Sequence, residues 1–223
     1  MPVTSVRSIK GDGWASVLLS SRRGLNKLGT GTLRPLLAEL RSCLVPECRC
    51  LAIVGEGGSF AVGADLREIG GLTPTDARTF SDLGNGIFRL LERSASVVVA
   101  GIDGFCLGGG LDLALAADWR MASTRSVFGH PGADLGLITG FGGTQRLPRL
   151  IGQRRAARWL LSAERVPAGE AYREGFLQEI CRPEQFEERL MSRIQRFAAM
   201  PAERIREVKL QLRHGSDRLE AGR

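Results

Sequence analysis

The chain has 223 residues, which is enough to bury a substantial core without the disulfide or metal staples of a miniprotein. Apolar residues make up 43% and charged residues 25% of the sequence, so the composition excludes a disordered tail and a fibrous repeat and predicts one compact, soluble fold. The formal net charge of +7 at pH 7 favours anionic partners such as nucleic acid, an acidic membrane surface or a phosphorylated ligand.

Cysteine usage and hydropathy indicate a cytoplasmic protein. Five cysteines, an odd number, are more typical of reduced thiols than of a secreted disulfide framework. Zinc binding is poorly supported, because the only histidines, His130 and His214, lie far in sequence from the cysteines at 43–50. No apolar run approaches the ~20 residues of a membrane helix, and residues 1–19 lack a secretory signal pattern. We therefore expect no membrane attachment and no metal.

Three short apolar runs predict buried strands over residues 14–19, 50–56 and 97–102. The last run is apolar without interruption, which predicts a strand covered on both faces. Leucines at helical spacing predict a helix over residues 33–44, and the sequence Thr73-Pro74-Thr75-Asp76 predicts the N-terminus of another. Strands that alternate with helices predict an α/β architecture.

Charge-rich helical patterns dominate the last part of the chain. We predict helices over residues 154–161, 168–174, 186–200 and 202–214, with Pro201 as the break between the last two. No linker separates them from the rest. We therefore treat residues 1–152 as the core and residues 153–223 as a helical C-terminal section of the same structural unit.

Two glycine-containing segments, residues 57–66 and 104–114, each follow a predicted strand. Neither matches a Walker loop or a dinucleotide-binding turn, which argues against nucleotide hydrolysis and hydride transfer. A glycine run that enters a helix exposes backbone N–H groups at the positive end of that helix, an arrangement that suits an oxyanion. The alternative is that Gly108, Gly109 and Gly110 only let the helix pack closely against a strand.

Two stretches of the sequence resemble one known family. Residues 96–152, SVVVAGIDGFCLGGGLDLALAADWRMASTRSVFGHPGADLGLITGFGGTQRLPRLIG, and residues 51–69, LAIVGEGGSFAVGADLREI, are similar to the signatures of the crotonase, or enoyl-CoA hydratase/isomerase, superfamily. The resemblance extends from about Trp14 to Leu212. It implies a crotonase-like spiral of ββα units followed by a helical oligomerisation region, shortened at the C-terminus because family members commonly continue further.

The resemblance also has implications for ligands and partners. It implies a homotrimer or hexamer that acts on an acyl-CoA thioester or on an acyl group bound to a carrier protein. No cofactor is expected, since coenzyme A would enter only as part of the substrate.

Carried over position by position, the resemblance implies that the backbone N–H groups of Ala64 and Gly109 form an oxyanion hole for the thioester carbonyl. Two preorganised donors in a dry site stabilise the negative charge of an enolate-like state, each by about 3 kcal/mol in comparable cases. Arg23 and Arg67 match cations near the coenzyme A phosphates or adenine, and solvated surface arginines are the alternative interpretation. Further substrate or coenzyme A contacts are implied at Leu25, Ala61, Ala64, Asp65, Leu66, Gly108, Gly109 and Gly132.

The sequence departs from the family pattern at the catalytic acids. Hydratases of this family use two glutamates to orient water and move its proton, and here the first position is Asp112 and the second is Gly132. Asp112 is the expected main acid/base, although its carboxylate is set back by about a bond length, and a carboxylate that stabilises the start of a helix is the alternative. The missing second carboxylate counts against ordinary hydration and simple double-bond isomerisation.

Two nearby residues are candidates for the missing partner. Histidine titrates near neutrality, which suits His130 for proton transfer, and Asp134 lies two positions beyond Gly132, on the same side of an extended segment. A hydrogen-bonded loop histidine and a solvated aspartate are the alternatives. Thr139 stands where a naphthoate-synthase-like relative has an aspartate, which argues against ring-closing chemistry. Cys106 is expected to be buried packing rather than a nucleophile.

The leading hypothesis is an enzyme that polarises an acyl thioester and uses Asp112 in a hydratase-, dehydratase- or isomerase-like step. A second hypothesis is a biosynthetic crotonase, a dehydratase or decarboxylase of polyketide or aromatic precursors on coenzyme A or a carrier protein. A third is a non-catalytic, acyl-CoA-binding subunit. Nucleic-acid binding ranks last, because the basic surface is accompanied by no recognised module and no aromatic platform.

Overall fold

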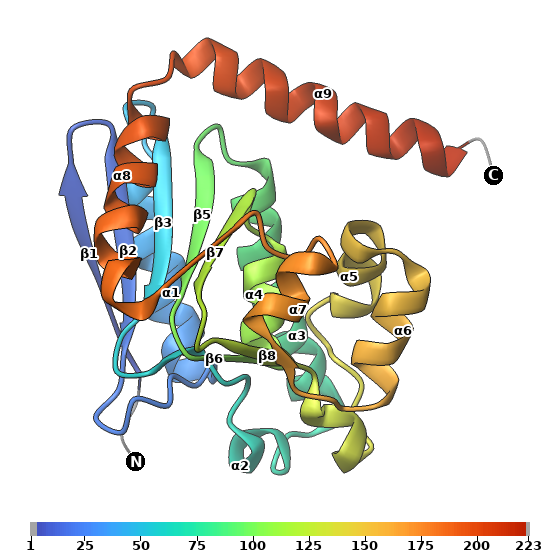
Figure 1. Cartoon of the computed structure of the whole chain (residues 1–223). Coiled ribbons are helices and arrows are strands. Elements are labelled where there is room, and N and C mark those ends of the chain that lie inside the picture. The colour runs from blue at the N-terminus through green and yellow to red at the C-terminus, as the bar shows by residue number, and fades with distance from the viewer. Residues whose placement is uncertain (1–3, 222–223) are drawn as a thin grey trace.

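A six-stranded sheet forms the centre of the protein in the computed structural model, which describes residues 4–221 (Figure 1). Its strand order is β1-β2-β3-β5-β7-β10, and all neighbours are parallel except the β1–β2 hairpin. The strands are β1 (Ser5–Gly11), β2 (Trp14–Ser20), β3 (Cys50–Gly55), β5 (Val97–Ile102), β7 (Trp119–Ser123) and β10 (Glu179–Cys181).

A smaller sheet of four short strands lies beside one end of the main sheet. Its order is β4-β6-β8-β9, and only the β8–β9 pair is antiparallel. Its strands are β4 (Ser59–Ala61), β6 (Phe105–Leu107), β8 (Val127–Gly129) and β9 (Val166–Pro167).

The chain repeats one path three times. A strand of the main sheet is followed by a strand of the small sheet and then by helix, as in β3-β4-α2, β5-β6-α4 and β7-β8-η1. The helical segments up to residue 161 are α1 (Thr30–Cys43), α2 (Leu66–Ile69), α3 (Pro74–Arg93), α4 (Gly109–Leu115), the 3₁₀ turn η1 (Pro131–Leu135), α5 (Gly143–Ile151) and α6 (Gln153–Leu161). Those that follow are α7 (Ala168–Arg173), the 3₁₀ turn η2 (Pro183–Gln185), α8 (Phe186–Ala198) and α9 (Ala202–Ala221).

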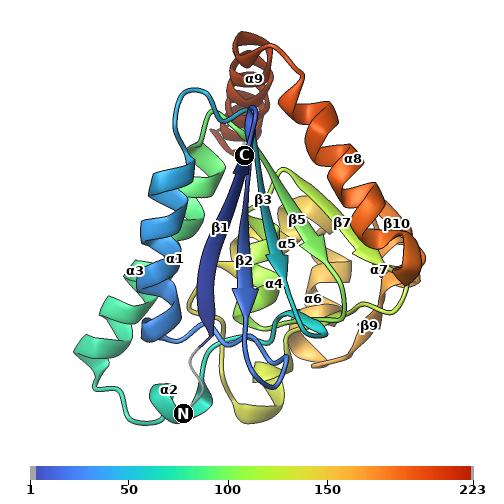
Figure 2. The same cartoon turned by 90° about the vertical axis from the view of Figure 1, so that its left-hand side faces the viewer.

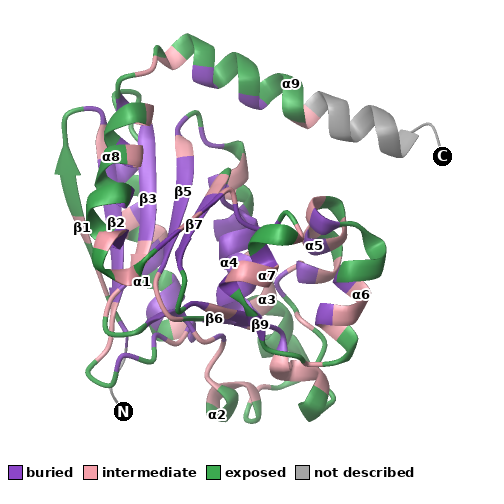
Figure 3. Cartoon of the chain, in the orientation of Figure 1, coloured by how far each residue is buried: buried purple, intermediate pink, exposed green. Residues whose placement is uncertain are grey.

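Both faces of the main sheet are covered. Figure 2 shows α1 and α3 on one side of the sheet and α8 on the other. In β5, Val98 and Ala100 belong to the larger apolar cluster with α1, α3 and α4, whereas Val99 packs with α8. The unbroken apolar run therefore has the two-sided burial that it predicts, and the buried residues concentrate in the strands and α4 (Figure 3).

Helix α9 runs away from the body of the molecule and is anchored through its first turns (Figure 1). Ile205 is buried, and Lys209 reaches Oδ2 of Asp118 at 2.5 Å and the carbonyl oxygen of Ser96 at 2.8 Å. Burial lowers the pKa of Lys209, and the Asp118 carboxylate offsets part of that effect. Within residues 4–221, no helix has both the length and the apolar character that a bilayer-spanning segment requires.

The predicted strands and helices are found, and the ends of those that precede α9 differ from the prediction by up to a few residues. Thr73 caps α3 as predicted, since its side chain accepts a hydrogen bond from the amide of Asp76 at 3.2 Å. The structure also contains strands that the sequence did not predict. They are β1, β7 and β10 in the main sheet and all strands of the small sheet. Two of them, β9 and β10, lie beyond residue 152, in the section expected to be helical. The strands of the small sheet have two or three residues each, too few for an alternating pattern to be visible.

Two glycines of α3 provide a matched test of its packing. A methyl group on Gly84 would lie 2.3 Å from a ring carbon of Phe141, whereas one on Gly86 would meet nothing within 4 Å. Gly84→Ala should therefore destabilise the protein by about 1–3 kcal/mol through overpacking. Gly86→Ala should stabilise it by up to about 1 kcal/mol through helix propensity. Urea unfolding measures both, and equal effects of the two changes would contradict the described packing of Phe141.

Candidate active site

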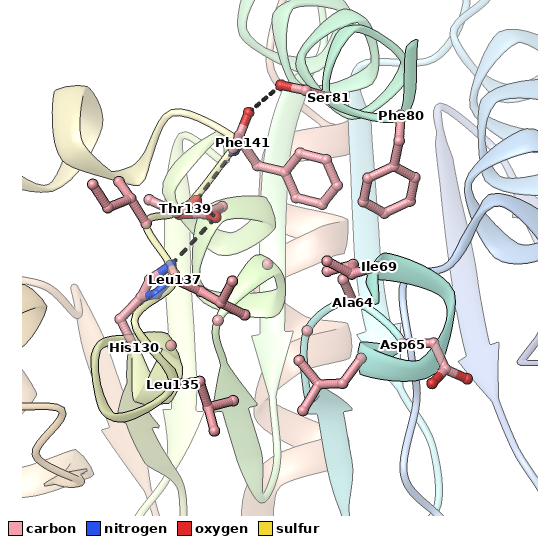
Figure 4. Close-up of a pocket in the computed structure, with 18 of the residues that line it drawn as sticks. Ala64, Asp65, Ile69, Phe80, Ser81, His130, Leu135, Leu137, Thr139 and Phe141 are labelled. Carbon is pink, nitrogen blue, oxygen red and sulfur yellow. Dashed lines mark hydrogen bonds and ion pairs between the residues drawn. The ribbon is translucent and has the colours of Figure 1, made fainter. Parts of the chain in front are cut away.

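A cavity of about 580 Å³ opens between α2, α3, the start of α4 and the segment over residues 130–141. This is a typical volume for a small-molecule site. Ala64 and Ile69 lie across it from His130 and Leu137, and Phe80 and Phe141 stand together at one end (Figure 4). Most of the lining is apolar, and the polar groups of Asp112, His130 and Thr139 belong to one part of the wall.

The glycine run after β6 sets the direction of α4. Gly108, the residue before the helix, has φ 53° and ψ −123°, a conformation that residues with a Cβ rarely adopt. Its amide donates to the carbonyl oxygen of Gly129 at 2.9 Å, and its carbonyl oxygen accepts from the amide of Asp112 at 3.1 Å. The helix therefore begins at Gly109, whose N–H has no acceptor within the helix.

The loop that carries Ala64 approaches the same point. A methyl group on Gly63, which has φ 93°, would lie 3.2 Å from the amide nitrogen of Gly109, so the two loops are in backbone contact. Ala64 follows Gly63 directly and lines the cavity with Gly109. Among the described residues, no hydrogen-bond acceptor is found for the amide of either Ala64 or Gly109.

Asp112 lies in the first turn of α4, two residues after the glycine run, and its side chain is fully buried. Its Oδ2 accepts a hydrogen bond from the hydroxyl of Thr139 and lies 3.4 Å from Nε2 of His130. Its Oδ1 has no hydrogen-bond partner among the described residues and packs against the backbone of Gly143. A carboxylate held in this way is oriented by its neighbours, with the more accessible imidazole beside it.

The segment with Thr139 is braced by α3 and α5. The amide of Phe141 donates to Oγ1 of Thr139 at 3.1 Å, and the carbonyl oxygen of Phe141 accepts from Nη1 of Arg146 at 2.7 Å. Arg146 in turn pairs with Glu92 of α3 at 2.5 Å. The Phe141 ring packs on Phe80, with ring centroids 5.1 Å apart.

Most of the residues singled out in the sequence line this cavity. They are Ala64, Asp65, Leu66, Arg67, Gly108, Gly109, Asp112, His130 and Gly132. Asp65 also caps α2 and pairs with Lys27 at 3.2 Å, and Figure 4 shows its carboxylate turned away from the cavity. These two contacts, with the Lys27 ammonium as the larger cause, hold the pKa of Asp65 below its usual value.

Four predicted residues lie elsewhere in the structure. Arg23 and Leu25 are exposed and do not line the cavity. Ala61 is fully buried at the end of β4, where its carbonyl oxygen contacts Gly110, and Asp134 is exposed on η1. The structure therefore brings His130, and not Asp134, next to Asp112.

Sequence reasoning missed the apolar wall and the role of Thr139 as a neighbour of Asp112. Phe80 lies on the buried side of α3, and the sequence does not distinguish a residue of a cavity wall from one of the core. The contact of Thr139 depends on the path of the loop over residues 136–142, and no spacing rule in the sequence predicts it.

Cys106 is unsuited to nucleophilic chemistry. Its side chain is fully buried, and burial, reinforced by the nearby Asp112 carboxylate, raises the pKa of its thiol well above the ordinary value. In the part of the chain that the structure describes, no three His, Cys, Asp or Glu side chains gather in a way that suits a metal ion.

Comparison with known proteins gives a consistent result. The model of the enoyl-CoA hydratase/isomerase family matches residues 10–222. A crotonyl-CoA hydratase of Syntrophomonas wolfei is 43% identical over 141 residues, which cover 63% of this chain and 54% of that protein. A short-chain-enoyl-CoA hydratase of Clostridium acetobutylicum is 36% identical over 175 residues, which cover 76% of this chain and 66% of that protein.

The fold has similar relatives among solved structures. The crystal structure of an enoyl-CoA hydratase from Bacillus anthracis superposes with a TM-score of 0.89 and 29% identity, covering 96% of this chain and 83% of that one. The chain belongs to the enoyl-CoA hydratase/isomerase family and has the crotonase fold. It spans 54% and 66% of the length of the two curated relatives above.

The five cysteines allow a direct test of how tightly the interior of the protein is packed. All five thiols are buried, so the native protein should react with Ellman's reagent at pH 8 far more slowly than a free thiol does. Addition of guanidinium chloride should then release five equivalents. Rapid reaction of one thiol in the native state, mapped by mass spectrometry to Cys106, would contradict its description as inert packing.

Proposed function

We propose that the protein is an enzyme that binds an acyl-CoA or carrier-protein-bound thioester and stabilises its enolate in a hydratase- or isomerase-like reaction. The observation that carries this proposal is the meeting of two loops at one cavity wall. The amides of Ala64 and Gly109 lie there without described acceptors, and Asp112 lies one turn further along α4.

In the proposed complex, the thioester oxygen lies between the amides of Ala64 and Gly109. Negative charge develops on that oxygen as the α-carbon or the β-carbon reacts, and N–H donors fixed by glycine backbones stabilise it without reorganising. The N-terminus of α4, to which Gly109 belongs, adds the favourable end of a helix dipole. The apolar lining excludes water and strengthens these interactions.

Asp112 acts as the main acid/base. In hydration it accepts a proton from the water molecule whose hydroxyl adds to the β-carbon, and that proton passes by way of His130 to the α-carbon, so that one water molecule is added in total. His130 supplies the second proton-transfer group, because its Nε2 lies 3.4 Å from Oδ2 of Asp112 and its side chain is 9% exposed toward the cavity, whereas that of Asp112 is fully buried.

The glycine at position 132 supports a second candidate function that also depends on a stabilised thioester enolate. Its position on η1 lines the cavity but brings no carboxylate to it. A decarboxylation that generates an enolate requires the oxyanion hole but does not require two carboxylates, because loss of carbon dioxide takes the place of proton abstraction. A biosynthetic crotonase of this kind is therefore the alternative to hydration.

Asp112→Asn tests the role of the buried carboxylate. It should lower kcat by about 10²- to 10⁴-fold on the best substrate in a panel of crotonyl-, longer enoyl-, branched and malonyl-type thioesters. Asp134→Asn is the matched control, because Asp134 is exposed and outside the cavity, and it should keep the parent rate. Full activity of Asp112→Asn would remove this residue from its role. Tight thioester binding without turnover across the panel would instead identify a binding subunit.

Gly132→Glu tests the meaning of the missing carboxylate. A Cβ at this position would lie 3.1 Å from the carbonyl oxygen of Leu137, so the backbone fits it after a shift of a few tenths of an ångström. The added carboxylate should raise the rate of crotonyl-CoA hydration, followed by the loss of enoyl-thioester absorbance. Ala133→Glu, one residue along and outside the cavity, should not. Equal rates for both variants would show that hydration here is not limited by this group.

A further inference from the structure

The hydroxyl of Thr139 lies directly beside the buried Asp112 carboxylate. It donates to Oδ2 of Asp112, the same oxygen that faces Nε2 of His130. Thr139 is half-buried and comes from the loop between η1 and α5, so its contact with Asp112 joins segments 27 residues apart in the chain. Neither the family comparison nor the proposed acid/base chemistry gives this residue a part.

The direction of the Thr139 hydrogen bond follows from its second partner. The backbone amide of Phe141 donates to Oγ1 of Thr139 at 3.1 Å. Because that amide has a proton and no lone pair to offer, it occupies an acceptor site of the hydroxyl and leaves the hydroxyl proton for another acceptor. The available acceptor is Oδ2 of Asp112. A hydrogen bond donated to a carboxylate favours its charged form.

The loop holds Thr139 in place independently of Asp112. The Phe141 carbonyl oxygen accepts from Arg146, which pairs with Glu92, and the Phe141 ring packs against Gly84 and Phe80 of α3. In addition, the carbonyl oxygen of Gly140 accepts from Ser81 at 2.6 Å and from Asn85 at 2.8 Å. These contacts fix the hydroxyl before a substrate arrives.

We propose that Thr139 is a positioning residue whose hydroxyl, made a donor by the amide of Phe141, binds the Asp112 carboxylate and fixes its Oδ2 toward His130. The inference rests on the proposed function of Asp112 and extends it. Oδ1 of Asp112, which has no described hydrogen-bond partner, packs against the backbone of Gly143, so Oδ2 is the oxygen that the polar neighbours reach.

The ionisable groups near Asp112 come from four neighbouring elements. They are His130, which follows β8, Cys106 of β6, and Arg146 of α5 with its partner Glu92 of α3. Their charges act on the parent and on a Thr139 variant alike, so a change between the two reports the hydroxyl.

Thr139→Val removes the hydroxyl and keeps the shape of the side chain, whereas Thr139→Ser keeps the hydroxyl. Protein labelled with ¹³C at the aspartate carboxyls gives the titration of Asp112 without substrate, its signal assigned as the one missing from Asp112→Asn. In Thr139→Val the midpoint of that titration should rise by about 1 to 2 pH units, the effect of losing a hydrogen bond to a charged group. Thr139→Ser should stay close to the parent.

Kinetics provide the second readout. Thr139→Val should lower kcat by about 10- to 100-fold with little change in KM, and the acidic limb of its pH–rate profile should move to higher pH. Thr79→Val is the matched control, because Thr79 lies on the exposed side of α3 and its hydroxyl donates to the carbonyl oxygen of Thr75 at 3.1 Å. It should leave both readouts unchanged.

The outcomes separate this inference from the proposed function. An Asp112 titration that is the same in Thr139→Val and the parent, in folded protein, would overturn the role of Thr139. Thr139→Ala replaces Thr139→Val if circular dichroism shows that the valine variant does not fold. If no variant or parent turns over any thioester while the Asp112 midpoint still rises in Thr139→Val, the proposed function fails and the positioning role of Thr139 remains.

Discussion

Backbone contact between two loops is the constraint on which the site depends. Gly63 and Gly109 approach so closely that a methyl group on Gly63 would lie 3.2 Å from the Gly109 amide nitrogen. Gly63 and Gly108 also have positive φ values, which residues with a Cβ rarely adopt. These conformations direct each loop toward the helix that follows it. The small sheet holds the loops together, since β4 and β6 are hydrogen-bonded neighbours in it. Glycine is therefore needed here for approach as well as for conformation.

The regular elements of the fold could largely be predicted from the sequence, because their signals are local. The apolar run over residues 97–102 indicates a strand covered on both faces, and the Thr73 cap indicates the start of α3; both are found. The small sheet could not be predicted in the same way. Strands such as β4 and β6 are three residues long, so their existence follows from the spiral path of the chain rather than from their own side chains.

Some residues of the candidate site could be predicted from the sequence, and others could not. Gly109 and Asp112 could be placed in the site from the resemblance to the family signature, and both lie in α4 because they are three residues apart in the chain. The choice between His130 and Asp134 could not, because it depends on how η1 turns after Pro131. The contact of Thr139 with Asp112 depends on packing between Phe141 and α3, which is a property of the folded loop and leaves no pattern in the sequence.

Phe141 couples the length of the cavity to the support of the loop that carries Thr139. Its ring closes one end of the cavity, and its main-chain amide and carbonyl oxygen link Thr139 to Arg146. A smaller side chain at this position would lengthen the cavity and, by the same change, loosen the support behind Thr139 and Asp112. Selection for bulkier substrates would therefore act through a pleiotropic site, and compensating changes are expected on α3, where Phe80 and Gly84 meet the ring.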